Sequence, residues 1–354
     1  MYNEYRIKMY ISTMSNQAGN PYNKTAAGKI AINSRKSVEV ILMRKNFRGK
    51  DFLAFKDMNR EEMEFITDLS IELKHKWVAR EPHEYLKGQV WAALFEKNST
   101  RTRNAFQRAA ADLGITTVYL RPDELQSGRG EPLKDTARMF DRYYDGLFIR
   151  TFGHEIVEEY AQWMDHPVIN GLTTTAHPTQ GIADMMTIKE KKGGYKGLKL
   201  CYAGNLYNVC YTTMIFCATL GIDMYVARPD GLEPDAAVLA EAMARAKVSG
   251  AKIVFTSDYD EALKDADIVY GMSHYSMGQA PEEVEKLKKA FHPYQVTMEA
   301  LKKAKGDAIF MHCLPAYRGI DVTDEVMECE QSMVWDQGEN RMHSIKGILA
   351  AIAL

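Results

Sequence analysis

From about Lys50 to the C-terminus, short apolar runs rich in β-branched residues alternate with longer amphipathic runs. The short runs suit strands, and the longer runs repeat apolar residues at helical spacing. This alternation is typical of parallel sheets covered by crossover helices. The pattern predicts strands at residues 89–95, 117–120, 146–150, 198–203, 223–227, 252–256, 267–270, 308–312 and 333–335.

A chain of 354 residues is longer than one ordinary hydrophobic core supports, so we expect two domains. The segment KEKKGGYKG, residues 189–197, closes a helical run with lysines and paired glycines, which indicates the boundary. The predicted fold class is α/β, with two domains that each have a mainly parallel sheet flanked by helices and are joined by interdomain helices. The predicted parts are an N-terminal extension (1–37), a first domain (38–188), a second domain (189–338) and a last helix (339–354) that packs back on the first domain.

Composition narrows the class of partner. The chain is 46% hydrophobic and 26% charged with a net charge of -2, which gives no broad field for nucleic acid or a membrane surface. An anionic ligand must therefore be held by a local site. No apolar run approaches the roughly 18 residues of a membrane-spanning helix.

Five cysteines without a CxxC pair indicate reduced thiols and no zinc cage, so we expect a cytoplasmic protein. Residues 1–37 are polar, and Glu4 is their only acidic residue against six basic ones. We interpret them as a loosely ordered extension. A mitochondrial transit peptide is the alternative, because such segments are also poor in acidic residues.

The stretch FEKNSTRTRNAF, residues 95–106, places two hydroxyls and two guanidinium groups within residues 99–103, directly after a predicted strand. The apolar positions that follow predict a helix, so Ser99 to Arg103 stand at its start. Free N–H groups and the positive end of the helix dipole point there, and an arginine can hold a phosphate through two N–H bonds. The alternative is a capped helix with solvated arginines.

Arg101 and Arg103 are two residues apart and cannot face the same way on a helix. We expect Arg101 to contact the ligand and Arg103 to pair with acidic neighbours.

A second polar cluster lies in AHPTQGIADMM, residues 176–186. Pro178 suits the first helical position, which places His177 at the cap and Gln180 three residues further on the same face. Both side chains can contact a ligand oxygen. A histidine that only forms local hydrogen bonds at a helix start is the alternative.

These two clusters, together with MHCLPAYRG at residues 311–319, resemble the aspartate/ornithine carbamoyltransferase family. The similarity runs from about residue 50 to the C-terminus. It implies that residues 38–188 bind carbamoyl phosphate and residues 189–338 bind an amine, without metal or organic cofactor. It also implies a homotrimer or a multiple of trimers, because Gln126 matches a loop that reaches a neighbouring subunit's site.

The resemblance further implies the role of each matching residue. Arg150, His177 and Cys313 would be catalytic. The positions that match contacts to carbamoyl phosphate are Ser99, Thr100, Arg101, Thr102, Gln126, Arg150, His177, Gln180, Cys313, Leu314 and Arg341. The Leu314–Pro315 bond would be cis. An inert buried thiol is the alternative for Cys313.

Cys313 and Arg341 resemble the ornithine branch, whose product is citrulline, and Asn208, Ser276 and Met277 match its amine-binding positions. Met272 stands where that branch has an aspartate for the α-ammonium, and His274 stands where it has tryptophan. A thioether cannot compensate a buried ammonium. Because the five matching positions outnumber the departure at Met272, we expect ornithine as the acceptor, with putrescine or a related amine or amino acid as the alternative.

Two other functional classes are alternatives. A dinucleotide-dependent dehydrogenase would share the α/β pattern, but the turn at residues 203–205 lacks GxGxxG. A non-catalytic regulatory paralogue would be expected to have lost phosphate-binding or carbonyl-binding residues, and every one of them is present.

Overall fold

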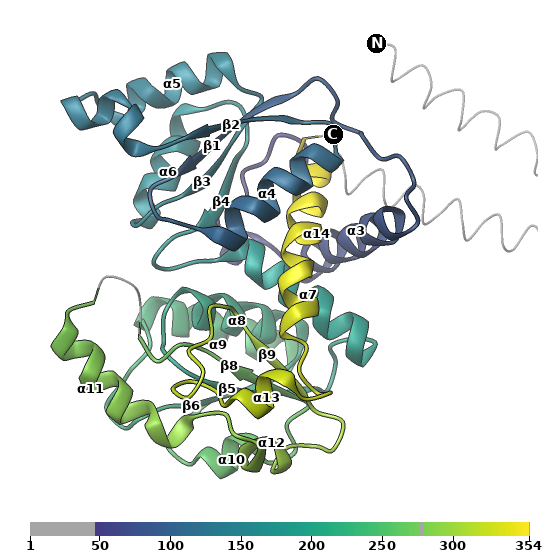
Figure 1. The fold of residues 1–354 in the computed structure, drawn as a ribbon, viewed down its shortest axis with the longest axis vertical. Helices are drawn as coiled ribbons and strands as arrows, with labels where there is room; N and C mark the ends of the chain where they lie inside the picture. The colour runs from purple at the N-terminus through teal and green to yellow at the C-terminus, as the bar shows by residue number, and fades with distance from the viewer. Residues whose placement is uncertain (1–46, 276–278, 354) are drawn as a thin grey trace, which may run out of the picture. The chain divides into compact units, whose positions relative to one another are not determined.

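The computed structural model describes residues 47–275 and 279–353, and within them nine strands form two parallel sheets (Figure 1). The predicted extension (1–37), Ser276 and Met277 lie outside the described residues. The chain divides into the units Met1–Phe47 and Arg48–Leu354, and the elements described below lie in the second unit.

The first sheet has four strands in the order β2-β1-β3-β4. All neighbouring pairs are parallel, so every connection crosses over through a helix or loop. The strands are β1 (Val90–Phe95), β2 (Thr116–Leu120), β3 (Gly146–Arg150) and β4 (Val168–Leu172).

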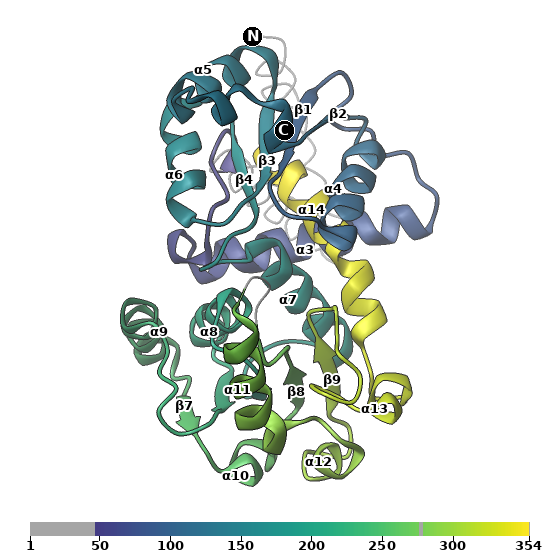
Figure 2. The same cartoon turned by 60° about the vertical axis from the view of Figure 1, so that its left-hand side comes forward.

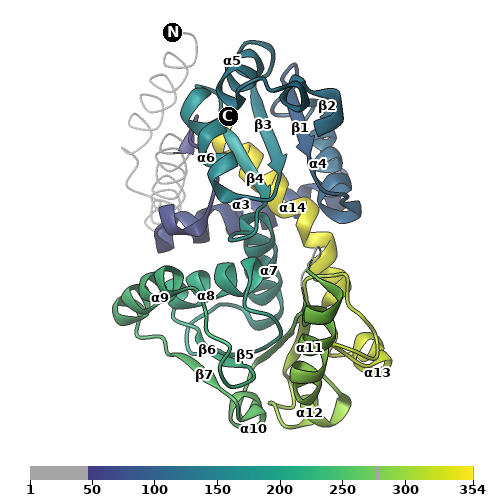
Figure 3. The ribbon, with the colours of Figure 1, turned by 90° about the vertical axis from the view of Figure 1, so that its left-hand side faces the viewer.

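Successive side chains of a strand point to opposite faces, and this alternation gives the first sheet two covered faces. Leu147 and Ile149 pack in the cluster that includes Val157 and Tyr160 of α6 (His154–Trp163) and Phe140 of α5 (Leu133–Tyr143). On the other face, Phe148 stacks on Phe106 of α4 (Thr100–Asp112), with ring centroids 4.2 Å apart. Figure 3 shows α6 and α4 on opposite sides of these strands.

The second sheet has five parallel strands in the order β7-β6-β5-β8-β9. The order reverses at β5, as in doubly wound α/β sheets, where ligands bind at the carboxyl ends of the strands beside the reversal. The strands are β5 (Lys199–Ala203), β6 (Asp223–Ala227), β7 (Ile253–Thr256), β8 (Ile268–Gly271) and β9 (Ile309–His312).

Helices and short 3₁₀ turns connect and cover the strands, and Figure 2 shows α7 and α14 running between the two sheets. The helix α14 packs against α3, α4 and α7, and also contacts β9. The remaining elements are η1 (Phe55–Asp57), α3 (Arg60–Val78), η2 (Pro122–Glu124), η3 (Gln126–Arg129), α7 (Pro178–Lys192), α8 (Asn208–Leu220), α9 (Ala236–Ser249), α10 (Tyr259–Leu263), α11 (Pro281–Phe291), η4 (His292–Tyr294), α12 (Met298–Lys302), α13 (Asp324–Glu328) and α14 (Val334–Ile352).

The strand predicted at residues 333–335 is wrong. Ser332 forms only an isolated bridge with Phe310, and α14 begins at Val334 and leaves Trp335 exposed. This helix therefore starts five residues before the predicted position 339.

Strand β4 was not predicted, although its residues are mostly buried between β3 and the segment near Phe52. Helix α9 begins at Ala236, because Asp235 accepts hydrogen bonds from the N–H groups of Ala237 and Val238 and caps the helix.

Candidate active site

A cavity of about 540 Å³ lies at the carboxyl ends of strands from both sheets. The segments that follow β1, β3 and β4 line one part of it, and those that follow β5, β8 and β9 line the rest. Parallel strands bring such segments to one edge of each sheet, which is where open α/β sheets bind ligands. With Arg341 of α14, the fold thus assembles one site from seven separate parts of the chain.

The helix α4 begins in this cavity, as the Ser99–Arg103 cluster predicts. Ser99 is the N-cap residue, but its side chain forms no capping hydrogen bond. Its hydroxyl instead accepts from Arg150 Nη1 at 3.2 Å, and Thr102 Oγ1 accepts from the same nitrogen at 3.2 Å. The start of α4 therefore presents free N–H groups, two hydroxyls and a guanidinium to one space, which suits an anion.

Arg341 reaches the same place from α14 and is 3% exposed. Its Nη2 donates to Thr102 Oγ1 at 3.0 Å, and its Nη1 donates to Gln180 Oε1 at 2.6 Å. The Nε atoms of Arg341 and Arg150 are buried and have no hydrogen-bond partner among the described residues. Buried donors without acceptors are unfavourable, so an anionic ligand would stabilise this arrangement.

Arg101 and Arg103 separate as predicted, although the partner of Arg103 differs. Arg101 lines the cavity. Arg103 lies over the ring of Tyr119, 3.6 Å from its centroid, and makes no ion pair with an acidic residue in the described part of the chain. The predicted acidic partner is therefore wrong: a cation–π contact with β2 takes its place.

His177 and Gln180 lie at the start of α7, with Pro178 at the first helical position. His177 is 2% exposed, and its backbone N–H donates to Thr212 Oγ1 at 3.0 Å, which fixes it to α8. Burial, together with the charges of Arg341, Arg150 and Arg101, lowers the pKa of the imidazole well below its usual value. The ring is therefore neutral at neutral pH and can donate one N–H.

Gln180 is buried beside the cavity and does not line it. Its Oε1 accepts from two residues that do, Arg341 and Cys313, with the Cys313 Sγ at 3.2 Å. Gln180 therefore acts on the cavity through these neighbours.

Cys313 and Leu314 follow β9 and line the cavity, and the Leu314–Pro315 bond is cis as the resemblance implied. Burial raises the pKa of Cys313 to about 11, although the nearby guanidinium groups oppose the rise. The side chain is therefore a neutral thiol that donates a weak hydrogen bond, and it is not a thiolate nucleophile.

The lining is strongly cationic. Lys97, Arg101, Arg150 and Arg341 face the cavity, and no aspartate or glutamate lies among its described lining residues. Burial, with help from Arg341 and Arg101, lowers the pKa of Arg150 to about 10, so it stays charged at neutral pH. The site is thus complementary to an anionic donor and offers no carboxylate to an ammonium group.

On the side formed by the second sheet, Asn208 and Met272 line the cavity. Asn208 begins α8 and donates from Nδ2 to the Thr173 carbonyl at 2.6 Å. Met272 directly follows β8, and Gly204 is close to it: a Cβ on Gly204 would lie 2.5 Å from the Met272 carbonyl oxygen.

Several lining residues were not predicted. Each is of an ordinary residue type in the sequence, and for most of them the one available signal was a position after a predicted strand. These residues are Lys97, Asn98, Leu172, Thr174, Asn205, Tyr207, Val209, Ser273, Tyr275, Gln279, Pro315 and Tyr317.

Gln126 begins η3 on the surface and does not line the cavity. Within residues 47–275 and 279–353, no cluster of three or more His, Cys, Asp or Glu side chains could hold a metal ion. None of the helices in these ranges combines the length and the apolar character that a bilayer crossing needs.

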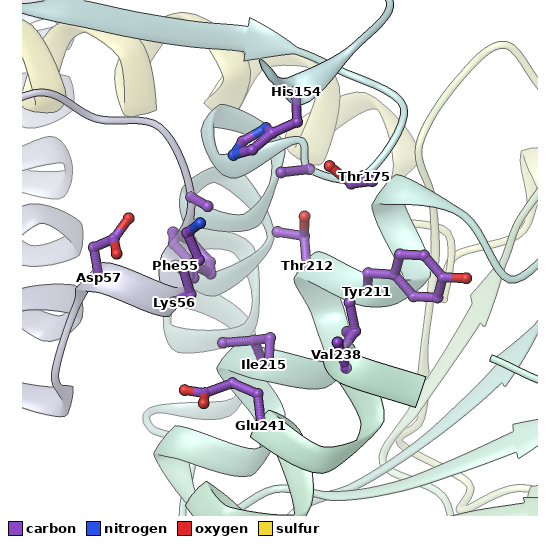
Figure 4. Close-up of a pocket in the computed structure, with 13 residues that line it drawn as sticks. Phe55, Lys56, Asp57, His154, Thr175, Tyr211, Thr212, Ile215, Val238 and Glu241 are labelled. Carbon is purple, nitrogen blue, oxygen red and sulfur yellow. The ribbon is translucent and has the colours of Figure 1, made fainter. Parts of the chain in front are cut away.

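A second cavity of about 490 Å³ is lined by residues of η1, α8 and α9 and by Thr175 and Ala176 (Figure 4). Thr174 faces the first cavity, whereas Thr175 and Ala176 face the second. Figure 4 shows Phe55 and Lys56 of η1 opposite Tyr211, Thr212 and Ile215 of α8. His177 lines the first cavity and Thr212 lines the second. The hydrogen bond from the His177 N–H to Thr212 Oγ1 therefore joins the linings of the two cavities.

Comparison with known proteins decides the family. The carbamoyl-phosphate-binding domain of aspartate/ornithine carbamoyltransferases matches residues 50–190, and their Asp/Orn-binding domain matches residues 196–352. The chain belongs to the aspartate/ornithine carbamoyltransferase family. The ornithine carbamoyltransferase of Pyrococcus horikoshii is 43% identical over 307 residues, which are 87% of this chain and 96% of that protein. That of Caldicellulosiruptor saccharolyticus is 45% identical over 305 residues, covering 86% of this chain and 99% of the relative.

Solved structures agree with this family assignment. The ornithine carbamoyltransferase of Pyrococcus furiosus has a TM-score of 0.83 at 43% identity and covers 86% of this chain and 97% of that one. A mitochondrial ornithine carbamoyltransferase from Coccidioides immitis still gives a TM-score of 0.77 at 28% identity, over 84% of this chain and 96% of that one. The carbamoyltransferase therefore shares its two-sheet architecture with relatives of low sequence identity.

Proposed function

We propose that this carbamoyltransferase moves the carbamoyl group of carbamoyl phosphate to the side-chain amine of L-ornithine, giving citrulline and phosphate. The observation that carries the proposal is the convergence of Arg101, Arg150 and Arg341 with two hydroxyls at the start of α4. Relatives that are named ornithine carbamoyltransferases support the choice of acceptor.

The phosphate of the donor would lie at the N-terminus of α4. The free N–H groups of the first turn, the hydroxyls of Ser99 and Thr102 and the guanidinium of Arg101 are the donors available to its oxygens. Arg341 holds Thr102 in place and adds a further positive charge. The same groups stabilise the phosphate as it leaves.

The transfer step needs donors where negative charge develops. The uncharged amine attacks the carbamoyl carbon, charge gathers on the carbonyl oxygen, the bond to the phosphate oxygen breaks, and the departing phosphate takes one proton from the nitrogen. Arg150 and the neutral His177 line the cavity and would donate to that oxygen. Fixed donors of this kind stabilise the transition state more than the ground state. Cys313, as a thiol, would contact the donor without forming a bond to it.

The proposal extends to organisation. Residues 38–188 would bind the donor and residues 189–338 the amine, and the chain would assemble as a homotrimer or a multiple of trimers in which Gln126 reaches a neighbouring site. A cytoplasmic location fits the five free cysteines.

A second acceptor is kept because one observation favours it. The described lining of the cavity has no carboxylate, and Met272 occupies the position where the ornithine branch carries aspartate. The α-ammonium of ornithine would then lack a charged partner. Putrescine has no α-amino-acid group and so does not need a carboxylate at position 272 for an α-ammonium.

A panel of amines tests both versions. The protein is incubated with carbamoyl phosphate and, in turn, L-ornithine, putrescine, L-lysine and L-aspartate, and phosphate release is followed with the ureido product. Release and citrulline formation with ornithine are expected. Reaction with another amine and none with ornithine would replace the acceptor and leave the carbamoyl transfer standing.

A further inference from the structure

Asp184 is a buried carboxylate that the transfer step does not use. It lies on α7, four residues after Gln180 and therefore one turn further on the same face, and it is 1% exposed. An unpaired carboxylate at such a place would be costly, so its partners define its role.

Three side chains donate to Asp184. Oδ1 accepts from Gln180 Nε2 at 2.7 Å and from Gln337 Nε2 at 2.7 Å, and Oδ2 accepts from the Tyr270 hydroxyl at 2.9 Å. Gln337 Oε1 in turn accepts the backbone N–H of His312 at 2.8 Å. The carboxylate thus joins α7 to α14, β8 and the end of β9.

An ionised carboxylate can only accept hydrogen bonds, and this fixes the amide of Gln180. Its NH₂ group must face Asp184, so its carbonyl oxygen faces the opposite way. There Arg341 Nη1 donates at 2.6 Å, while Nη2 of the same guanidinium donates to Thr102 at 3.0 Å. Rotation of the Gln180 amide would set NH₂ against the guanidinium and break this arrangement.

We propose that Asp184 is a positioning residue for carbamoyl-phosphate binding: through the Gln180 amide it holds the Arg341 guanidinium against Thr102, where the donor binds. The inference rests on the proposed function only for the identity of the ligand. The relay itself consists of contacts inside the protein.

Protonation would interrupt the relay. Burial raises the pKa of Asp184 to about 6, although the hydrogen bonds from Gln180, Gln337 and Tyr270 and the charge of Arg341 oppose the rise. A protonated Asp184 keeps an acceptor oxygen but loses the negative charge that strengthens the hydrogen bond from the Gln180 NH₂, so it holds this amide less firmly. Other titratable or charged groups that interact electrostatically with it are Arg341, Tyr270, Cys313, Cys217 and Tyr202.

A double-mutant cycle tests the relay. Calorimetry gives the Kd of carbamoyl phosphate at pH 7.5 for the wild type, Asp184→Leu, Gln180→Ala and the double variant; leucine has a similar size and no acceptor for the Gln180 amide. We expect Asp184→Leu to weaken binding about tenfold in the wild type and less than twofold in the Gln180→Ala background, because the carboxylate acts through that amide. The same factor in both backgrounds would overturn the relay.

Two further readouts keep the test decisive. A crystal structure of Asp184→Leu should show the Arg341–Thr102 hydrogen bond broken, and an unchanged bond would contradict the inference even if no donor bound. If Asp184→Leu did not fold, wild type and Gln180→Ala would be titrated between pH 5 and 8. The wild type should lose affinity below about pH 6 more steeply than the variant, and parallel curves would overturn the proposal.

Discussion

Arg341 on α14 donates from Nη2 to Thr102 Oγ1 on α4 at 3.0 Å, although 239 residues separate the two. Helix α14 therefore supplies the Arg341 guanidinium to the cavity at the N-terminus of α4. Because α14 also packs on α3 and α7, the placement of this guanidinium depends on the packing of four helices. Donor binding and the fold of the C-terminal helix are thus coupled.

The two arginines of the α4 start should differ in function. Arg101→Ala removes a charge that faces the cavity, and we expect the Kd of carbamoyl phosphate to rise at least a hundredfold. Arg103→Ala removes a contact with Tyr119, and we expect the Kd to change less than threefold with a loss of stability of about 0.5–1 kcal/mol. Isothermal titration and thermal unfolding measure both; equal losses of affinity would contradict the assignment.

His177 should act as a neutral donor. Since burial and three arginines hold its pKa well below the usual value, kcat should show no ionisation of this residue between pH 6 and 8. His177→Gln should lower kcat about a hundredfold by removing a donor and should leave the apparent pKa values of the profile unchanged. An ionisation near pH 6.5 that disappears in His177→Gln would refute the neutral role.

Met272 should limit the use of ornithine. Met272→Asp adds the carboxylate that the described lining lacks, and a charge-assisted hydrogen bond to the α-ammonium should raise kcat/KM for L-ornithine about tenfold. Met272→Asn is the control, because asparagine has nearly the same shape as aspartate without its charge. This variant should change kcat/KM for L-ornithine less than threefold. If both variants behaved alike, the ammonium would be held elsewhere.

The buried pair of Lys346 and Asp112 should stabilise the docking of α14. Lys346 is 0% exposed and donates to Asp112 Oδ2 at 2.6 Å. Burial raises the pKa of Asp112, but hydrogen bonds from Lys346 and Arg108 outweigh it and hold that pKa below its usual value. Lys346→Met leaves a buried charge with one partner fewer, so the free energy of unfolding should fall by about 3 kcal/mol.

A matched control for this change is Lys303→Met, which breaks an exposed pair with Asp260. Exposed pairs contribute little, so the expected loss is below about 1 kcal/mol. Denaturant unfolding at pH 7.5 measures both variants. A loss no larger for Lys346→Met than for Lys303→Met would show that the buried pair does not hold α14.

The strands could be predicted where apolar runs were continuous. The bounds of β3 and β6 agree with the predicted residues 146–150 and 223–227, because strands of parallel sheets bury both faces and read as apolar runs. Strand β4 was missed because Asn170-Gly171 resembles a turn. In the structure a Cβ at Gly171 would lie 2.5 Å from the Phe148 ring, so packing between strands requires this glycine.

The site was predictable where chemistry is concentrated in a few neighbouring residues. Ser99–Arg103 and His177–Gln180 stand at helix starts that the sequence predicted, and the family that these motifs suggested is confirmed. Asp184 and Gln337 gave no comparable signal, because 153 residues separate them and only the packing of α14 on α7 brings them together. The residues that position the site therefore had to come from the structure.

Calorimetric titration of the full-length protein with carbamoyl phosphate, in the absence of any amine, tests the central claim most directly. We predict saturable binding of one donor per chain that inorganic phosphate competes away and that Arg101→Ala abolishes. A titration of the folded wild-type protein that shows no binding would contradict the assignment of this cationic cavity to the donor.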